Sequence, residues 1–152
     1  MLTACAGPPP LPGEPLAAVT AKLGQPTASY PDGADTLLEY AAGPFGQYAW
    51  MARIGADGRL RSYEQVLTTE KFATVKIGKD TKQTILRTFG RPADVVHYWS
   101  VDGDVWLYRY KEQDVWNSEM SVQFDRNDVV QAMVNGPDPT RERRRLRSRQ
   151  QE

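Results

Sequence analysis

Residues 78–92 read GKDTKQTILRTFGRP and predict a short helix that a glycine and a proline bring to an end. Asp80 and Gln83 have the spacing of a capping box, in which a side chain at the helix start accepts a backbone N–H bond. Gly90 and Pro92 then close the helix. Between these ends an apolar stripe is supplied by Ile85, Leu86 and Phe89.

The same pattern occurs a second time, nearer the N-terminus. The matching pairs are LGQP (23–26) with FGRP (89–92), TLLEY (36–40) with VWLYRY (105–110), and ARIGADGRLRSY (52–63) with VQFDRNDVVQAM (122–133). Each copy therefore predicts a helix, a Gly-x-Pro stretch and three strands. We expect an α+β fold of tandem helix–β-hairpin repeats, with short helices packed on one face of an antiparallel sheet built from both copies.

Turn residues predict the strand register. A two-residue turn at Asp102-Gly103 is a strong hairpin signal. It would place Trp99 opposite Trp106, His97 opposite Tyr108, and Val95 opposite Tyr110. In the last hairpin of each copy, Gly58 or its counterpart would occupy a left-handed loop position. The expected partners there are Ile54 with Leu60, Phe124 with Val130, Val122 with Ala132, Arg53 with Arg61, and Gln123 with Gln131.

The chain divides into four segments by composition and repeat. These are a lipobox remnant with a Pro/Gly-rich tether (1–13), the first repeat (14–67), the second repeat (68–138) and a basic disordered tail (139–152). The formal net charge is +0, but six arginines fall within 141–149. The rest of the chain is mildly acidic, which argues against a nucleic-acid-binding body. The tail is expected to be solvated or to dock on an anionic envelope surface.

The first residues predict where the protein is located. Leu2-Thr3-Ala4-Cys5 has the pattern of a bacterial lipobox, and the prolines that follow suit an extended spacer. Only the end of a signal peptide is present, so we expect the natural chain to begin further upstream. A diacylglycerol on Cys5 would anchor the protein, and Ala6 in the next position favours the outer membrane over the inner one. The alternative is a single N-terminal cysteine without a role.

Three stretches resemble a known family: FATVKIGKDTKQTILRTFGRPADVV (72–96), DVWLYRY (104–110) and SVQFDRNDVVQAM (121–133). They are similar to the SmpA/OmlA (BamE-type) outer-membrane lipoprotein domain. A tandem arrangement of this unit is similar to the β-lactamase-inhibitor-protein fold. The chain departs from a single BamE-type domain in its second unit, its basic tail and Asp128, where the family usually has glycine. The resemblance thus implies a paralogue with a BamE/BLIP-like fold.

An aromatic set is the main candidate for partner binding, because exposed aromatic side chains often dominate protein interfaces. Its members are Trp99, Trp106, Tyr108 and Tyr110, with Arg53 and Arg61 as exposed neighbours on the strands. The alternative is that these rings form the core beneath the helices. Trp50 and Trp116 are equally open to either interpretation.

Catalysis and metal binding have little support in the sequence. His97 is the only histidine and Cys5 the only cysteine, and no nucleophile stands at a recognisable spacing from His97. Asp102, Asp104 and Asp114 lack the further oxygen ligands of a calcium loop. We therefore expect no enzymatic activity, metal or cofactor.

The predicted function is that of a lipid-anchored outer-membrane lipoprotein, facing the periplasm. It would act as a non-catalytic scaffold that binds a protein during envelope or outer-membrane protein assembly. The first alternative is an inhibitor that covers a periplasmic or secreted enzyme with its sheet face. The second is an enzyme that uses His97 in a pocket. The partner is expected to be an outer-membrane or periplasmic protein, and not a nucleic acid.

Overall fold

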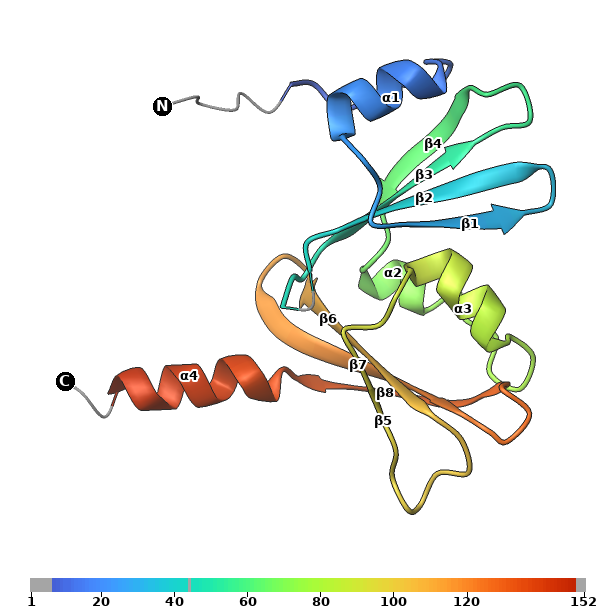
Figure 1. Ribbon diagram of the computed structural model, residues 1–152. Coiled ribbons are helices and arrows are strands. Elements are labelled where there is room, and N and C mark those ends of the chain that lie inside the picture. Colours follow the sequence, from blue (N-terminus) through green and yellow to red (C-terminus); the bar gives the residue numbers. More distant parts are fainter. Residues whose placement is uncertain (1–6, 44, 150–152) are drawn as a thin grey trace. The chain divides into compact units, whose positions relative to one another are not determined.

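A computed structural model describes residues 7–43 and 45–149. The chain forms two compact units, Met1–Tyr40 with Trp50–Glu64, and Ala41–Ala49 with Gln65–Glu152. The expected division placed residues 41–49 with the first repeat, whereas they belong to the second unit. The α+β class is confirmed. The sequence left open whether the repeats form one sheet or two, and the structure has two four-stranded antiparallel sheets (Figure 1).

The strands of each sheet follow one another in chain order, so neighbouring strands are joined by short connections. The first helix and sheet comprise α1 (Leu16–Leu23), β1 (Ala28–Asp32), β2 (Asp35–Ala41), β3 (Ala49–Ile54) and β4 (Leu60–Gln65). The second set comprises α2 (Thr69–Phe72), α3 (Lys82–Phe89), β5 (Asp94–Val96), β6 (Val105–Glu112), β7 (Trp116–Phe124), β8 (Val130–Pro137) and α4 (Pro139–Arg149). The first unit thus has one more strand than the sequence predicted, since β1 pairs in front of the expected strands. In the second unit β5 takes the place of the first strand of the expected hairpin.

Equivalent residues make equivalent hydrogen bonds in the two units. The helix start is tied to the last hairpin by Leu60 N donating to Glu14 O (2.8 Å) and by Val130 N donating to Asp80 O (2.9 Å). The helix end is fixed in the same way, because the hydroxyl of Tyr40 donates to Gly24 O (3.1 Å) and that of Tyr108 to Gly90 O (2.8 Å). Both glycines have φ of 79°, a conformation that side chains disfavour.

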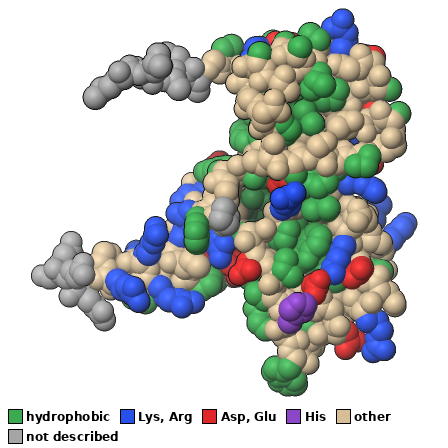
Figure 2. Space-filling model, viewed as in Figure 1, with side chains coloured by type: hydrophobic (Ala, Val, Ile, Leu, Met, Phe, Trp, Pro, Cys, Tyr) green, Lys and Arg blue, Asp and Glu red, His purple; other side chains and the backbone are tan. Residues whose placement is uncertain are grey.

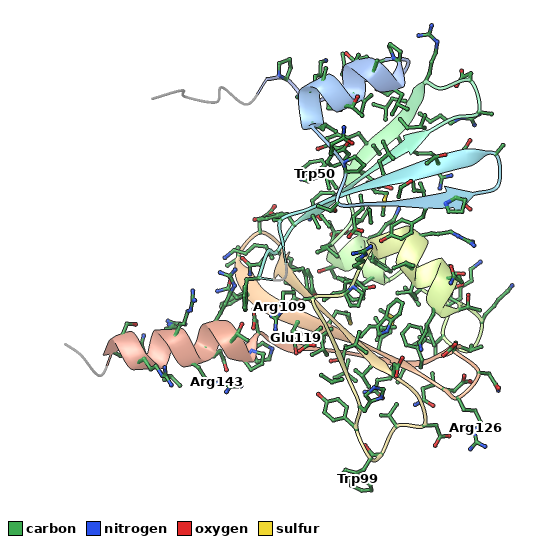
Figure 3. All side chains as sticks on the ribbon, in the orientation of Figure 1. Trp50, Trp99, Arg109, Glu119, Arg126 and Arg143 are labelled. Carbon is green, nitrogen blue, oxygen red and sulfur yellow. The ribbon has the colours of Figure 1, made fainter. Side chains whose placement is uncertain are left out.

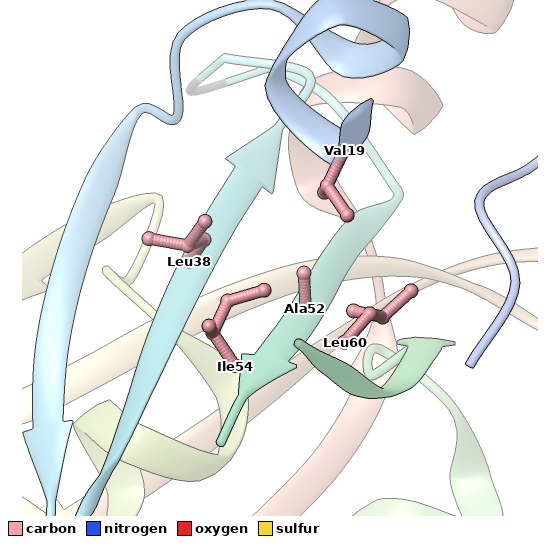
Figure 4. Packing of buried hydrophobic residues seen from close by; sticks show 5 residues of the cluster. All are labelled: Val19, Leu38, Ala52, Ile54 and Leu60. Atoms are coloured by element: carbon pink, nitrogen blue, oxygen red, sulfur yellow. The ribbon is translucent and has the colours of Figure 1, made fainter. Parts of the chain in front are cut away.

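The core of the first unit lies between α1 and one face of its sheet (Figure 4). Its buried members are Val19, Leu38, Ala52, Ile54 and Leu60, with Leu23, Tyr40 and Tyr63 packed around them. Strand residues two apart share a face, which is why Ala52 and Ile54 both reach the helix. No side chain caps α1, and its first N–H donates instead to Gly58 O in the last hairpin.

The core of the second unit is aromatic. Phe72 stacks on Phe89 with ring centroids 4.6 Å apart and planes at 17°. Tyr110 meets Phe72 edge-on at 5.0 Å, and Tyr108 lies 5.8 Å from Phe89. The short helix α2 and the end of α3 therefore cover the rings of β6.

The expected hairpin around Asp102-Gly103 is wrong. Val95 pairs with Trp106 and Val96 with Val105, so residues 97–104 form a long loop in place of a two-residue turn. Gly103 does not have the positive φ that such a turn requires. A side chain there would collide with the backbone of Phe124 and Asp125, so this glycine permits a close approach of two chain segments.

Two smaller predictions also differ from the structure. Phe124 pairs with Val130 as expected, but a bulge between Gln123 and Phe124 shifts the register, so that Val122 pairs with Met133 and Gln123 with Ala132. The cap of α3 is Thr81, whose hydroxyl accepts from Thr84 N. The Asp80 carboxylate turns back and accepts from Lys76 N at 2.8 Å.

The tail expected to be disordered is helical over Pro139–Arg149. Asp138 starts the helix, because its carboxylate accepts from Thr140 N (2.9 Å) and its carbonyl accepts from Arg141 N and Glu142 N. Arginine also has a high helix propensity, and basic side chains near the last turn complement the helix dipole. Composition alone therefore gave the wrong state for this segment.

Candidate functional site

A groove of about 670 Å³ opens on the first unit beside the last turn of α1. Its walls are formed by Gly7, Pro8, Pro9, Ala21, Lys22, Leu23, Trp50 and Tyr63. The volume falls within the range of small-molecule sites. All the wall residues that the structure describes belong to the first unit.

The proline segment forms one wall of this groove and is therefore not a free spacer. Pro10 is buried, Gly13 N donates to Leu60 O at 2.7 Å, and Arg59 donates to Gly13 O at 2.9 Å. Since Pro8 and Pro9 border the end of α1, residues 7–13 run back along that helix. The described part of the expected tether is thus bonded to the first unit at Gly13.

Two stacked aromatic rings form the opposite wall. Trp50 on β3 and Tyr63 on β4 have ring centroids 4.8 Å apart and planes at 19°. Trp50 keeps 39% of its surface exposed and lies beside α1 (Figure 3). Burial raises the pKa of the Tyr63 hydroxyl, so this ring stays neutral at physiological pH. Sequence reasoning left Trp50 ambiguous and missed Tyr63, although aromatic residues flanking a tight hairpin are a known cross-strand signal.

The groove has few polar groups. Among the wall residues that the structure describes, only Lys22 is charged, and its ammonium donates to Glu14 at 2.6 Å. That hydrogen bond lowers the pKa of Glu14 and therefore favours its ionised form. The arrangement therefore suits an apolar, extended ligand and provides no set of groups for acid–base chemistry.

The predicted aromatic set is split by the structure. Trp99 is 100% exposed at the tip of the 97–104 loop (Figure 3). Trp106 is half-buried and meets Phe124 edge-on at 5.0 Å. Tyr108 and Tyr110 are buried beneath α2 and α3, so their assignment to partner binding is wrong. Their rings pack on Phe72 of α2. The sequence of β6 does not show which of its faces a helix covers, so it could not distinguish these buried rings from exposed ones.

Arg53 and Arg61 form ion pairs within the first unit. Arg53 donates to Asp32 at 2.8 Å and to Asp35 at 3.1 Å, and these hydrogen bonds, the one to Asp32 first, raise its pKa. Arg61 lies 3.6 Å from Asp35. These pairs hold the β1–β2 turn against β3 and β4, which explains both arginines without a partner protein.

His97 has a carboxylate neighbour but no enclosed setting. Its Nδ1 lies 3.1 Å from Asp104, which also accepts a 2.6 Å bond from Lys82. The Lys82 bond holds the pKa of Asp104 below its usual value. The His97 side chain is 76% exposed, whereas a pocket enzyme would require a cleft around it. The group is therefore best described as an ion-pair network that fixes the 97–104 loop on α3.

The three aspartates considered for calcium do not meet. Asp102 and Asp104 precede β6, whereas Asp114 follows it in the next turn. Over residues 7–43 and 45–149, no group of three or more histidine, cysteine, aspartate or glutamate side chains is arranged to hold a metal ion.

A charged cluster lies on the second sheet where α4 begins (Figure 3). Arg109 faces Glu119 across β6 and β7, with Nε 3.9 Å from the Glu119 carboxylate and 3.8 Å from that of Asp138. All three side chains are largely buried. Burial raises the pKa of Glu119, although the charge of Arg109 opposes this shift. The cluster stabilises the junction of the sheet with α4.

The raised pKa of Glu119 predicts a pH effect on stability. The folded state binds this proton more tightly than the unfolded state, so ionisation favours unfolding. We expect wild type to lose stability relative to Glu119→Gln as the pH rises from about 4 to about 7. Urea unfolding midpoints measured over this range would show the trend.

Glu112 provides a matched control of opposite sign. Bonds from Ser118 (2.6 Å) and Asn135 (3.1 Å) lower its pKa. Wild type should therefore gain stability relative to Glu112→Gln as the pH rises through the ordinary range of a glutamate. The same trend in both variants would contradict this account.

The two ends of the chain carry the predicted lipid anchor and the basic tail that was expected to bind an anionic envelope surface. Cys5, the proposed lipidation site, lies outside the described residues. Lys and Arg side chains gather on α4, which has no buried residue (Figure 2). In the described part of the chain, no helix combines the length and apolar character needed to cross a membrane.

Comparison with known proteins gives one distant structural likeness. No protein-family model matches the chain, and no curated protein matches it. The crystal structure of a DUF4309 family protein (YjgB) from Bacillus subtilis is similar over 78% of this chain and 74% of that chain, with 16% sequence identity and a TM-score of 0.33.

Proposed function

We propose that this protein is a non-catalytic binding module of the bacterial envelope, anchored in the outer membrane by a lipid on Cys5. It holds a segment of an outer-membrane or periplasmic protein in the groove of the first unit. The observation that carries the proposal is the half-exposed Trp50–Tyr63 stack, which forms one wall of an apolar groove. Aromatic side chains in such pockets supply most of the binding energy at protein interfaces.

The proposed binding site is this groove, and not the aromatic residues of the second sheet that the sequence suggested. Tyr108 and Tyr110 are buried under the helices of their own unit. These two rings are therefore not available to cover the active site of an enzyme, as the inhibitor alternative requires. In the second unit Trp99 remains exposed.

Site-specific photocrosslinking in intact cells tests the groove. A benzoylphenylalanine at the position of Ala21, an exposed groove residue, should form an adduct with one envelope protein. Trp50→Ala should remove this adduct while the protein remains folded. Ala56, an exposed alanine in the β3–β4 turn, is the matched control position and should give none. Equal adducts at both positions, or an adduct that persists in Trp50→Ala, would show that the groove is not the binding site.

The anchor is tested separately by fractionating cells. Full-length protein with a native signal peptide should fractionate with the outer membrane, and Cys5→Ala should become soluble in the periplasm. Stable membrane anchoring takes more than one acyl chain, and the diacylglycerol on Cys5 would supply two. Because Cys5→Ala removes both chains, almost all of the protein should move from the membrane fraction to the soluble fraction. If Cys5→Ala stays with the membrane as wild type does, the lipid anchor is wrong.

A further inference from the structure

We propose that α4 and the exposed ring of Phe45 form a surface that docks on anionic phospholipids, with a headgroup phosphate bound by Arg144 beside that ring. The surface lies in the second unit, so it does not rest on the groove of the first unit. Two separate observations point to it. One is positive charge that the described chain leaves uncompensated, and the other is a small hollow between Phe45 and two arginines.

The positive charge of α4 is not neutralised by neighbouring side chains. The helix has six arginines and a single acidic residue, Glu142, and none of its residues is buried (Figure 2). Among the residues that the structure describes, only Arg141 of these six has a carboxylate partner, with its Nε 3.6 Å from Asp138. Like charges four positions apart on a helix destabilise it, as Arg141 and Arg145 do here. An anionic surface would remove this repulsion from a helix of 11 residues that no packing supports.

A hollow of about 60 Å³ lies beside the first turn of α4. Its lining consists of Phe45, Thr140, Arg141 and Arg144. A water molecule needs about 10–15 Å³ of such space, so the hollow has room for a phosphate-sized group and not for a whole ligand. The hydroxyl of Thr140 donates to Asp138 at 2.6 Å, which leaves the guanidinium of Arg144 to bind the anion.

The ring of Phe45 is held next to this hollow although the residue is 69% exposed. Its carbonyl accepts a bond from Arg141 at 3.0 Å, and its ring centroid lies 5.7 Å from the guanidinium carbon of Arg109. All three residues belong to the second unit. An exposed phenylalanine beside basic side chains is the combination that binds at the boundary between lipid headgroups and acyl chains.

The type of basic residue favours a phosphate as the ligand. Lysine and arginine are mixed in the rest of the chain, whereas α4 has arginine alone. The planar guanidinium can bind a phosphate through two parallel hydrogen bonds, which an ammonium group cannot do. A nucleic-acid duplex also carries phosphates, but it has no apolar layer for the ring of Phe45 to enter. A bilayer has both.

Flotation of the chain with lipid vesicles tests the proposal without a lipid on Cys5. We expect binding to vesicles that contain cardiolipin and none to vesicles of phosphatidylcholine alone. Binding should be lost as salt rises, because the Debye length falls from about 10 Å at 0.1 M to about 3 Å at 1 M. Arg144→Gln combined with Arg145→Gln should weaken binding by about tenfold or more, since each basic residue near an anionic surface contributes a factor of about five. Phe45→Ala should weaken it by about fivefold or more through the lost apolar contact.

Arg143→Gln combined with Arg147→Gln is the matched control, because it removes the same charge from another face of the same helix. It should weaken binding by less than about threefold, since charge away from the membrane is screened. Glutamine has nearly the helix propensity of arginine, so circular dichroism should show the same helix content in all variants. Equal losses from the two arginine pairs, or unchanged binding in Phe45→Ala, would overturn the proposed site. Binding to a DNA duplex or an oligoglutamate peptide, with none to either vesicle, would overturn the lipid as partner and assign α4 to that class of ligand.

Discussion

Phe72→Ala is expected to lower the free energy of unfolding of the second unit by about 3–4 kcal/mol, within the range found for buried phenylalanines. Phe72 is 3% exposed and contacts the rings of Phe89, Tyr108 and Tyr110. It comes from the four-residue helix α2, which is too short to be stable by itself. Its loss would therefore leave a cavity and also release α2 from the sheet.

Urea unfolding followed by far-UV circular dichroism measures this effect. Phe45→Ala is the matched control, because Phe45 belongs to the same unit but is 69% exposed. We expect that variant to change the free energy of unfolding by less than about 1 kcal/mol. If both variants lose the same stability, Phe72 does not anchor the core.

The elements that the sequence predicted well are those with short-range causes. The apolar spacing of α3, the glycines that end both helices and the Phe124–Val130 pair all depend on residues close together in the chain. Gly58 has φ of 75°, as the hairpin required. Asp128 takes the corresponding place with φ of 61°, which aspartate tolerates better than most residues. The tandem pattern of helices and strands follows from such local signals.

The predictions that failed depend on contacts between distant segments. Gly103 looked like a turn glycine, but its role is to let the backbone at residues 124–125 approach. Tyr108 and Tyr110 have the same alternating pattern whether a helix covers them or not. The bulge at Gln123 leaves no mark in the composition of β7 or β8. For Gly103, Tyr108 and Tyr110 the deciding neighbour lies more than ten residues away in sequence.

The groove could not be predicted from the sequence for the same reason. Trp50 and Tyr63 are recognisable as aromatic strand residues, but their stacking depends on the register of β3 and β4. The wall opposite these rings depends on where residues 7–13 run, which a proline-rich sequence does not reveal. A proline-rich segment has the same composition whether it is a free spacer or packs against a domain.

Arg109→Met is expected to have the other large effect, a loss of about 3–5 kcal/mol in the free energy of unfolding. Methionine has a volume close to that of arginine, so the change removes the charge and leaves little cavity. Glu119 would then lose the positive charge that opposes the cost of its burial. Asp138 would keep Arg141, whose Nε lies 3.6 Å from its carboxylate, as a charged neighbour. The cost of burying a charge in a poorly polarisable interior exceeds what the surrounding packing regains.

This interpretation makes a prediction that a purely steric role for Arg109 would not. If the loss comes from uncompensated carboxylates, Arg109→Met combined with Glu119→Gln should recover part of the stability, because one anion is removed with the cation. Asp138 also starts α4 through its bond to Thr140 N, so the single variant should lose helical circular dichroism as well. Arg126→Met is the matched control, since that side chain is 76% exposed beside Asp102 and exposed pairs contribute little. Equal losses in the single and double Arg109 variants would mean that packing of the guanidinium, and not its charge, holds the sheet to α4.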